Sequence, residues 1–214
     1  MKQHERRKKS SDRLINAYLE LASEQGVSAL TFDNIGLRAG YSRNLAFQKF
    51  GSKSGLLASV IDHIHDKMSE RRQKQNLDVL TGLEGLLLYC DVHFAALEKS
   101  AEMKAYFILM SEAIAAMSEM REQFVGSHKR SATELMRLIR LGRTDGSIRE
   151  DVAVDMAAQI IGTQMIGISS QYLIEPSFNL KRACKELHVL IRSAYGTGKD
   201  KLALPKPAEA VAGR

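Results

Sequence analysis

A predicted helix near the N-terminus begins with side chains that can recognise DNA bases. Arg43, Asn44 and Leu45 follow Ser42, a residue type that caps helix N-termini. Arginine can bind guanine through two hydrogen bonds, asparagine can do the same with adenine, and an apolar side chain can contact the methyl group of thymine. When a helix enters the major groove, its N-terminal residues reach the base edges. We therefore predict that Arg43, Asn44 and Leu45 read bases; the alternative is that they are simply solvated.

Other side chains in the same region are suited to the phosphate backbone. Hydroxyl groups, ammonium groups and the amides at helix N-termini all bind phosphate oxygens. These properties predict phosphate contacts from Thr31, Ser42, Lys49 and Lys53. For Thr31 and Ser42, capping a helix is a sufficient explanation by itself, and the two roles are compatible.

Two short helices are predicted to position these side chains. They cover residues 31–38, closed by Gly40, and residues 42–49, and they are joined by residues 39–41. A short turn that contains glycine, placed between two such helices, is typical of the helix-turn-helix motif. The preceding segment carries apolar residues at helical spacing and stops at Gly26.

Positive charge is concentrated in the same quarter of the chain. Residues 1–60 hold ten Lys and Arg against five Asp and Glu, a net charge of +5, whereas the remaining residues hold 21 against 20, a net charge of +1. This imbalance favours a polyanion as partner, although a solubilising segment is the alternative. Residues 1–9 are predicted to be a flexible basic arm that either contacts DNA or is a disordered charged tail.

The composition and the spacing of apolar residues predict an all-α protein. The 214 residues are 44% hydrophobic and 26% charged, and proline occurs only at positions 176, 205 and 207, so no proline breaks a helix before residue 176. Long helices are predicted for residues 54–75, 79–98, 101–118, 120–142, 151–174 and 178–195. The expected domains are the arm at 1–9, a helix-turn-helix domain at 10–55, a helical bundle at 56–195 and a disordered tail at 196–214.

The sequence also argues against several other classes of protein. No apolar stretch approaches the ~18 residues that span a membrane, and two cysteines make no disulfide framework, which favours the cytoplasm. Neither a nucleophile elbow nor a phosphate loop is present, so we expect no enzyme and no cofactor. Cys90 and His93, and likewise Cys184 and His188, could each share one side of a helix, but incidental buried residues are the simpler interpretation and no metal site is expected.

The run from Leu30 to Leu57 carries several unrelated residue types at fixed spacing: Thr31, Ile35, Ala39-Gly40, Ser42, Phe47, Phe50 and Ser52-Lys53. In this pattern the chain resembles the DNA-binding domain of TetR-family transcriptional regulators over about residues 10–60. Four features depart from the family pattern, one of them being Ser54-Gly55 in place of the usual acid after the lysine. Gly36 replaces the usual alanine, which predicts a softer second helix. Phe47 replaces the common tyrosine, which keeps the positioning contact but lacks the hydroxyl, and Asn44 replaces a small residue.

The resemblance implies a three-helix head followed by a bundle for effector binding and dimerisation. It implies a homodimeric repressor that binds a palindromic operator in double-stranded DNA and is released by a small-molecule effector, with helix 54–75 as the lever. A regulator without a small-molecule ligand, controlled by a protein partner or by its own abundance, is the alternative. A third hypothesis is a helical enzyme or interaction module whose head only resembles a DNA reader.

Two sets of residues in the bundle are assigned to these roles. Side chains with apolar bodies and a few polar tips predict a ligand pocket at Tyr89, His93, Met103, Tyr106, Phe107 and Met110. The last two helices are predicted to form the dimer interface through Ile161, Met165, Ile168, Tyr172, Leu187 and Ile191. Packing within the chain is the alternative for both sets.

Overall fold

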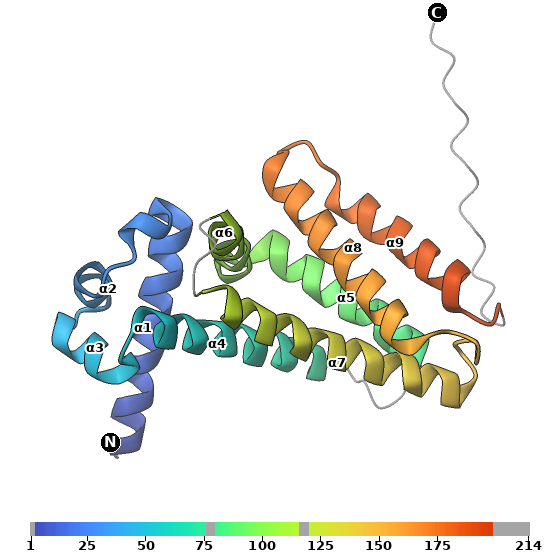
Figure 1. The fold of residues 1–214 in the computed structure, drawn as a ribbon, viewed down its shortest axis with the longest axis horizontal. Coiled ribbons are helices and arrows are strands. Elements are labelled where there is room, and N and C mark those ends of the chain that lie inside the picture. Colours follow the sequence, from blue (N-terminus) through green and yellow to red (C-terminus); the bar gives the residue numbers. More distant parts are fainter. Residues whose placement is uncertain (1–2, 76–79, 116–119, 199–214) are drawn as a thin grey trace, which may run out of the picture.

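The computed structural model describes residues 3–75, 80–115 and 120–198. In these ranges the chain is helical throughout, with no named strand, and it folds into a small head and a longer body (Figure 1). The elements are α1 (Gln3–Gln25), a 3-10 turn (Val27–Ala29), α2 (Phe32–Ala39), α3 (Arg43–Phe50), α4 (Lys53–Gln73), α5 (Gly82–Lys99), α6 (Ala101–Ala115), α7 (Arg121–Asp145), α8 (Val154–Ile174) and α9 (Leu180–Tyr195). The prediction of an all-α fold with a helix-turn-helix head is confirmed.

The head consists of α1, α2 and α3, and its helix ends are set by local chemistry. The hydroxyl of Thr31 accepts a hydrogen bond from the Asn34 N–H and begins α2. Gly40 ends α2 in the left-handed conformation, with φ of 75°, which glycine adopts without steric penalty. The side chains that fill the head are fully buried and come from all three helices and the turn: Leu14, Leu21, Leu30, Ile35 and Ala46.

The N-terminal arm expected at residues 1–9 is not a separate segment. Helix α1 begins at Gln3 and continues without a break to Gln25. Residues 3–25 contain neither glycine nor proline, so nothing stops the helix, and the hydroxyl of Ser10 bonds back to the carbonyls of Arg6 and Arg7. The basic side chains therefore extend from the first turns of a helix, while residues 1–2 lie outside the described chain.

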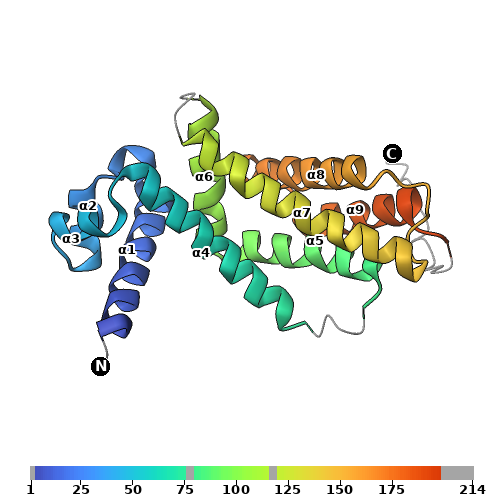
Figure 2. The ribbon, with the colours of Figure 1, turned by 60° about the horizontal axis from the view of Figure 1, so that its bottom comes forward.

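The body is built from α4 to α9, with α5 packed against α4, α7 and α9 (Figure 2). Helices α5 and α7 approach closely at one point because both carry glycine there. A Cβ atom on Gly82 would lie 2.0 Å from the backbone nitrogen of Gly142. The Gly82 N–H also donates to the Asp145 carboxylate at 2.6 Å. Burial alone would raise the pKa of Asp145, but hydrogen bonds from Ser147 and Gly82 lower it below its ordinary value.

Three residues assigned to the predicted tail belong to the folded body. Residues 196–198 are part of the body, because Thr197 donates from its backbone N–H to Ser147 and from its hydroxyl to Gly146. Residues 199–214 lie outside the described chain, as do residue 79 and residues 116–118 of two predicted helices. None of the helices that the structure describes combines the length and hydropathy needed to cross a bilayer.

Candidate nucleic-acid interface and ligand cavity

Helix α3 presents most of its predicted base-reading face to solvent. The Ser42 hydroxyl accepts from the Leu45 N–H at 3.2 Å and starts the helix. Arg43 and Asn44 are exposed, whereas Leu45 is half-buried. Arg43 lies 3.6 Å from Asp33, but both side chains are about two-thirds exposed, and such a pair is worth little. The guanidinium is therefore free to exchange this partner for another acceptor.

Phe47 occupies the same outward face. Its side chain is 53% exposed, and its ring meets that of Phe32 edge-to-face at 5.6 Å. An aromatic ring held in this way by a neighbour in α2 has a fixed orientation but leaves half of its surface open. Phe47 thus supplies a positioned apolar surface next to the exposed Gln48.

Lys49 differs from its prediction as a phosphate contact. Its ammonium donates to the Arg7 carbonyl at 2.8 Å and to the Ser11 hydroxyl at 3.0 Å, both in α1. Partial burial, and then the charge of Arg7, lower the pKa of Lys49. The side chain therefore ties α3 to α1 instead of pointing away from the head, because α1 extends seven residues further toward the N-terminus than expected.

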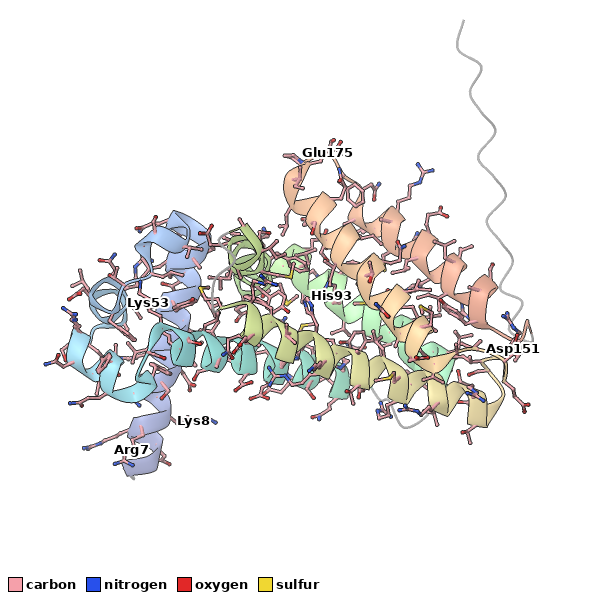
Figure 3. All side chains as sticks on the ribbon, viewed as in Figure 1. Arg7, Lys8, Lys53, His93, Asp151 and Glu175 are labelled. Atoms are coloured by element: carbon pink, nitrogen blue, oxygen red, sulfur yellow. The ribbon has the colours of Figure 1, made fainter. Side chains whose placement is uncertain are left out.

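Lys53 is the exposed first residue of α4, directly after the Ser52 hydroxyl that caps this helix (Figure 3). Thr31 and Ser42 cap α2 and α3, the role that was predicted for them beside phosphate binding. Basic side chains of the first turns of α1, including Arg7 and Lys8, extend beyond the head in Figure 3. The head thus offers three capped helix N-termini and flanking positive charge, which are the groups that bind phosphate.

Gly36 has a packing role that the sequence did not reveal. A Cβ atom there would lie 2.9 Å from the Tyr41 carbonyl oxygen and 3.1 Å from the backbone nitrogen of Arg43. The missing side chain lets the start of α3 rest against α2. Gly36 therefore allows the close approach of α2 and α3, in addition to its lower helix propensity in α2.

The body contains a cavity of about 510 Å³ between α4, α5, α6, α7 and α8. Five of the six predicted pocket residues line it: Tyr89, His93, Met103, Tyr106 and Phe107. Met110 is buried but is not among the lining residues, so its assignment to the pocket is corrected. Met110 lies one turn further along α6 than Phe107, and its side chain packs in the hydrophobic core beyond the cavity wall.

Sequence inspection missed much of the polar lining. The Nε2 atom of His65 forms a hydrogen bond of 2.8 Å with the Ser127 hydroxyl. The Tyr106 hydroxyl forms another with the same Ser127 oxygen, also at 2.8 Å. Burial lowers the pKa of His65 to about 4, with smaller effects from Arg130 and Arg72. These residues come from three helices, and single polar residues scattered along separate helices give no local sequence signal.

His93 forms a second polar group in the cavity. The Ser169 hydroxyl donates to the Met165 carbonyl at 2.7 Å, so it accepts from His93 Nε2–H at 2.9 Å. Burial lowers the pKa of His93 to about 4, and the charge of Arg72 adds to this. His65 and His93 are therefore neutral near pH 7, and burial also lowers the pKa of His128, the third histidine of the cavity lining.

Arg72 is the cation of the cavity wall. Its guanidinium lies 4.9 Å from the centre of the Tyr89 ring. Within the described residues it forms no salt bridge, and the acidic Asp155 lines the cavity from α8. The cavity thus combines an apolar wall, neutral hydrogen-bonding groups, the guanidinium of Arg72 and the carboxylate of Asp155.

The predicted dimer-interface residues lie mostly inside the chain. Four of them are at most 4% exposed and pack in the core: Ile161, Met165, Leu187 and Ile191. Ile168 and Tyr172 are half-buried against the same core. The assignment of the four buried residues is corrected, because α8 carries apolar residues on both sides and only one side faces outward; for Ile168 and Tyr172 it stays a prediction.

The open side of α8 carries Met156, Ile160 and Ile174, and α9 carries the exposed Leu190. Ile160, Gly167 and Ile174 follow at intervals of seven residues, which keeps them on one side of the helix. Helices α8 and α9 lie side by side along one edge of the body (Figure 1). Exposed apolar side chains gathered on two neighbouring helices are typical of a surface that packs against another protein.

The two cysteine–histidine pairs do not combine into one site. Cys90 is buried with its sulfur 3.8 Å from that of Met165, and His93 belongs to the cavity. Cys184 and His188 instead meet Asp91 of α5, away from the cavity.

The geometry defines a class of protein: an all-α chain with an exposed recognition helix on a small head and a cavity in a helical body. Residues 14–60 match the model of the bacterial regulatory proteins of the tetR family. The chain has the fold of TetR-family transcriptional regulators, and no curated protein matches the sequence.

Solved structures agree with this fold over nearly the whole chain. A protein from Rhodococcus sp. described as a TetR-family transcriptional regulator has a TM-score of 0.76 at 17% identity, covering 87% of this chain and 98% of that one. SmeT, the repressor of the Stenotrophomonas maltophilia multidrug efflux pump SmeDEF, has in its triclosan complex a TM-score of 0.77 at 23% identity, covering 92% and 95%. A protein from Saccharomonospora viridis described as a transcriptional regulator, in complex with choline, has a TM-score of 0.72 at 17% identity, covering 91% and 99%.

Proposed function

We propose that this protein is a transcriptional repressor that binds a palindromic DNA operator as a homodimer and leaves it when a small molecule fills the cavity. The observation that carries the DNA-binding part is the outward face of α3. It offers Arg43, Asn44 and Phe47 to solvent on a head that matches the tetR family model. A major groove about 12 Å wide accepts one such helix.

The operator-binding test uses the purified full chain and fragmented genomic DNA from its source. Bound fragments are sequenced, and the shared site is then footprinted. Arg43→Ala should lose the footprint at salt concentrations where Arg143→Ala, a matched exposed arginine on α7, keeps it. Equal loss in both variants, or a chain that selects no common site, would reject base reading by α3.

The dimer is proposed to form through the apolar side of α8 and α9. Two heads related by a two-fold axis can read two half-sites one DNA turn apart. Ile160→Glu combined with Leu190→Glu should give a monomer in sedimentation experiments and should weaken operator binding. Ile114→Glu, a change at an exposed isoleucine on α6, serves as the control. A dimer that survives the double change would place the interface elsewhere.

The cavity supports control by a small molecule over control by abundance alone. Its volume of about 510 Å³ falls within the range of ligand sites, roughly 300–1,000 Å³. The neutral His65 and His93 and the apolar wall favour a largely apolar effector with one or two hydrogen-bonding groups. Arg72 can in addition receive an anionic group. Two solved structures of similar fold are complexes with triclosan and with choline, which supports a small-molecule ligand for this chain.

An effector must bind one arrangement of the heads more tightly than the other, because equal binding shifts no equilibrium. Candidate compounds are screened by thermal shift, and each binder is tested for release of the operator. Phe107→Ala should weaken binding of the releasing compounds, while operator binding without compound stays the same. If no releasing compound depends on a lining residue, the regulator without a small-molecule ligand becomes the better description.

A further inference from the structure

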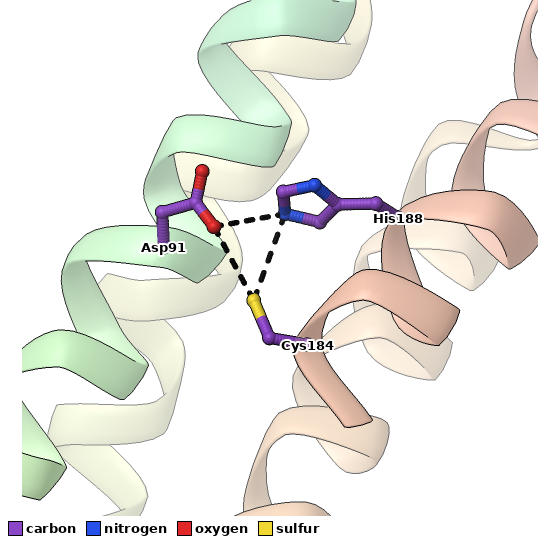
Figure 4. Close-up of side chains that lie close together, drawn as sticks. All are labelled: Asp91, Cys184 and His188. Atoms are coloured by element: carbon purple, nitrogen blue, oxygen red, sulfur yellow. Dashed lines mark hydrogen bonds and ion pairs between the residues drawn. The ribbon is translucent and has the colours of Figure 1, made fainter. Parts of the chain in front are cut away.

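A cluster of metal-ligand side chains lies where α5 packs on α9, apart from the head and the cavity (Figure 4). Asp91 extends from α5, and Cys184 and His188, one turn apart, extend from α9. The Cys184 Sγ lies 3.3 Å from Asp91 Oδ1 and 3.8 Å from His188 Nε2, and the last two atoms are 3.2 Å apart. A sulfur, a nitrogen and an oxygen thus form one compact triangle.

The contacts of the histidine ring argue against a catalytic relay. In a relay of nucleophile, base and acid, the acid holds Nδ1 while the nucleophile faces Nε2. Here both the thiol and the carboxylate approach the same nitrogen, Nε2. A proton cannot pass through the ring in that arrangement. Three different atoms that face a common point are instead the requirement for coordinating one ion.

The size of the triangle fits a small divalent ion. The circle through three atoms with these separations has a radius of about 2.0 Å, and zinc binds nitrogen and oxygen at about 2.0–2.2 Å and sulfur at about 2.3 Å. An ion at these distances would lie within about 1 Å of the plane of the three atoms, as in a tetrahedral site. The Asp91 side chain is 51% exposed, which leaves a fourth position accessible to water.

We propose that Asp91, Cys184 and His188 bind one Zn²⁺ ion and thereby clamp α5 to α9. A thiolate, an imidazole and a carboxylate suit zinc, whereas Mg²⁺ and Ca²⁺ take oxygen ligands. The thiolate and the carboxylate also balance the charge of the ion, and the thiol proton leaves to solvent on binding. This proposal assigns a metal to a chain whose sequence predicts none, and it does not depend on DNA binding.

The test is cobalt substitution of the full-length chain, without a histidine tag and with a reductant that is not a thiol. After removal of bound metal with a chelator, Co²⁺ should bind at one ion per chain and give a thiolate-to-cobalt charge-transfer band. Zn²⁺ should displace the cobalt and remove the band. Cys184→Ser should abolish the band, whereas Cys90→Ser, which changes the other cysteine of the chain, on α5, should leave it unchanged.

A second variant separates loss of a ligand from loss of the fold. Asp91→Asn changes a half-exposed side chain, so the chain should keep its circular dichroism spectrum. Its affinity for Co²⁺ should fall by at least about 100-fold, the upper end of the loss caused by removing an outer-shell partner. An absence of cobalt binding, a band that survives Cys184→Ser, or an Asp91→Asn affinity equal to the wild type would each overturn the proposal. The triad would then be a hydrogen-bonded packing contact only.

Discussion

Acidification from about pH 7.5 to about pH 5 should destabilise this protein through His65 and His93, two of the three histidines that line its cavity. The pKa of His65 and of His93 is lowered to about 4 in the folded chain, against the ordinary histidine value of 6.5. Between these two pKa values the unfolded state binds protons that the native state does not. Stability is therefore complete above pH 6.5 and falls as the pH drops from 6.5 toward 4.

The size of the effect follows from the two pKa values. A histidine shifted from 6.5 to about 4 loses about 2 kcal/mol of stability between pH 7.5 and pH 5. We assign this amount to His93. His65 is less enclosed, so we discount its share for solvent screening to about 1 kcal/mol. The total of about 3 kcal/mol is a large part of the roughly 5–15 kcal/mol that stabilises a typical domain.

The assay is urea unfolding followed by circular dichroism, since the chain has no tryptophan. His93→Gln should remove about two-thirds of the loss between the two pH values, because glutamine does not titrate and can still donate to Ser169. Tyr106→Phe is the matched control: the pKa of Tyr106 is raised to about 12, so losing its hydroxyl should lower stability equally at both pH values. If His93→Gln and wild type lost the same stability on acidification, the burial of a neutral imidazole would be refuted.

Three further predictions concern the head and the body. Lys53→Ala should weaken binding to every DNA sequence and reduce the slope of log affinity against log salt by about 1, measured by fluorescence anisotropy at several salt concentrations; an unchanged slope would remove Lys53 from the phosphate contacts. Asn44→Ala should relax specificity at one operator position, measured with a set of single-base operator variants, and a uniform weakening would contradict base reading. Gly82→Ala should destabilise the chain by about 3 kcal/mol or more in urea unfolding, because the new Cβ atom would lie 2.0 Å from the Gly142 nitrogen; a loss below about 1 kcal/mol would show that α5 and α7 separate easily.

Helix ends in the head could be predicted from the sequence because they are set locally. Thr31 and Ser42 cap through contacts three residues away, and Gly40 ends α2 by its own conformation. The length of α1 could not be predicted in the same way. Clustered positive charge is compatible with a disordered arm or with a helix, and the contact of Lys49 with Arg7, 42 residues earlier, decides between them.

The faces of the body helices could not be assigned for a different reason. In α8, Ile160 is 45% exposed and the adjacent Ile161 is 1% exposed, although the two side chains are chemically identical. A helix with apolar residues on both sides has no unique inward face in its sequence. The choice is made by the neighbours, because α5, α6, α7 and α9 all pack on α8. The same holds for Asp91, Cys184 and His188, which are brought together only when α5 meets α9.

Two helices connect the cavity physically with the head. Helix α4 begins at Lys53 beside α3, and its His65 and Met68 line the cavity, while α6 lines the cavity with Tyr106 and packs directly on α1. A displacement of His65 moves Lys53, twelve residues earlier on the same stiff helix, over a lever of about 18 Å at ~1.5 Å per residue.

A compound that touches only α5, α7 and α8 can therefore bind without moving a head. We predict that compounds whose affinity falls in Met68→Ala release the operator, whereas compounds insensitive to this change bind without release. Calorimetry gives the affinities, and anisotropy of labelled operator gives the release. Release by compounds that ignore both Met68 and Tyr106 would mean that the signal leaves the cavity by a route other than α4 and α6.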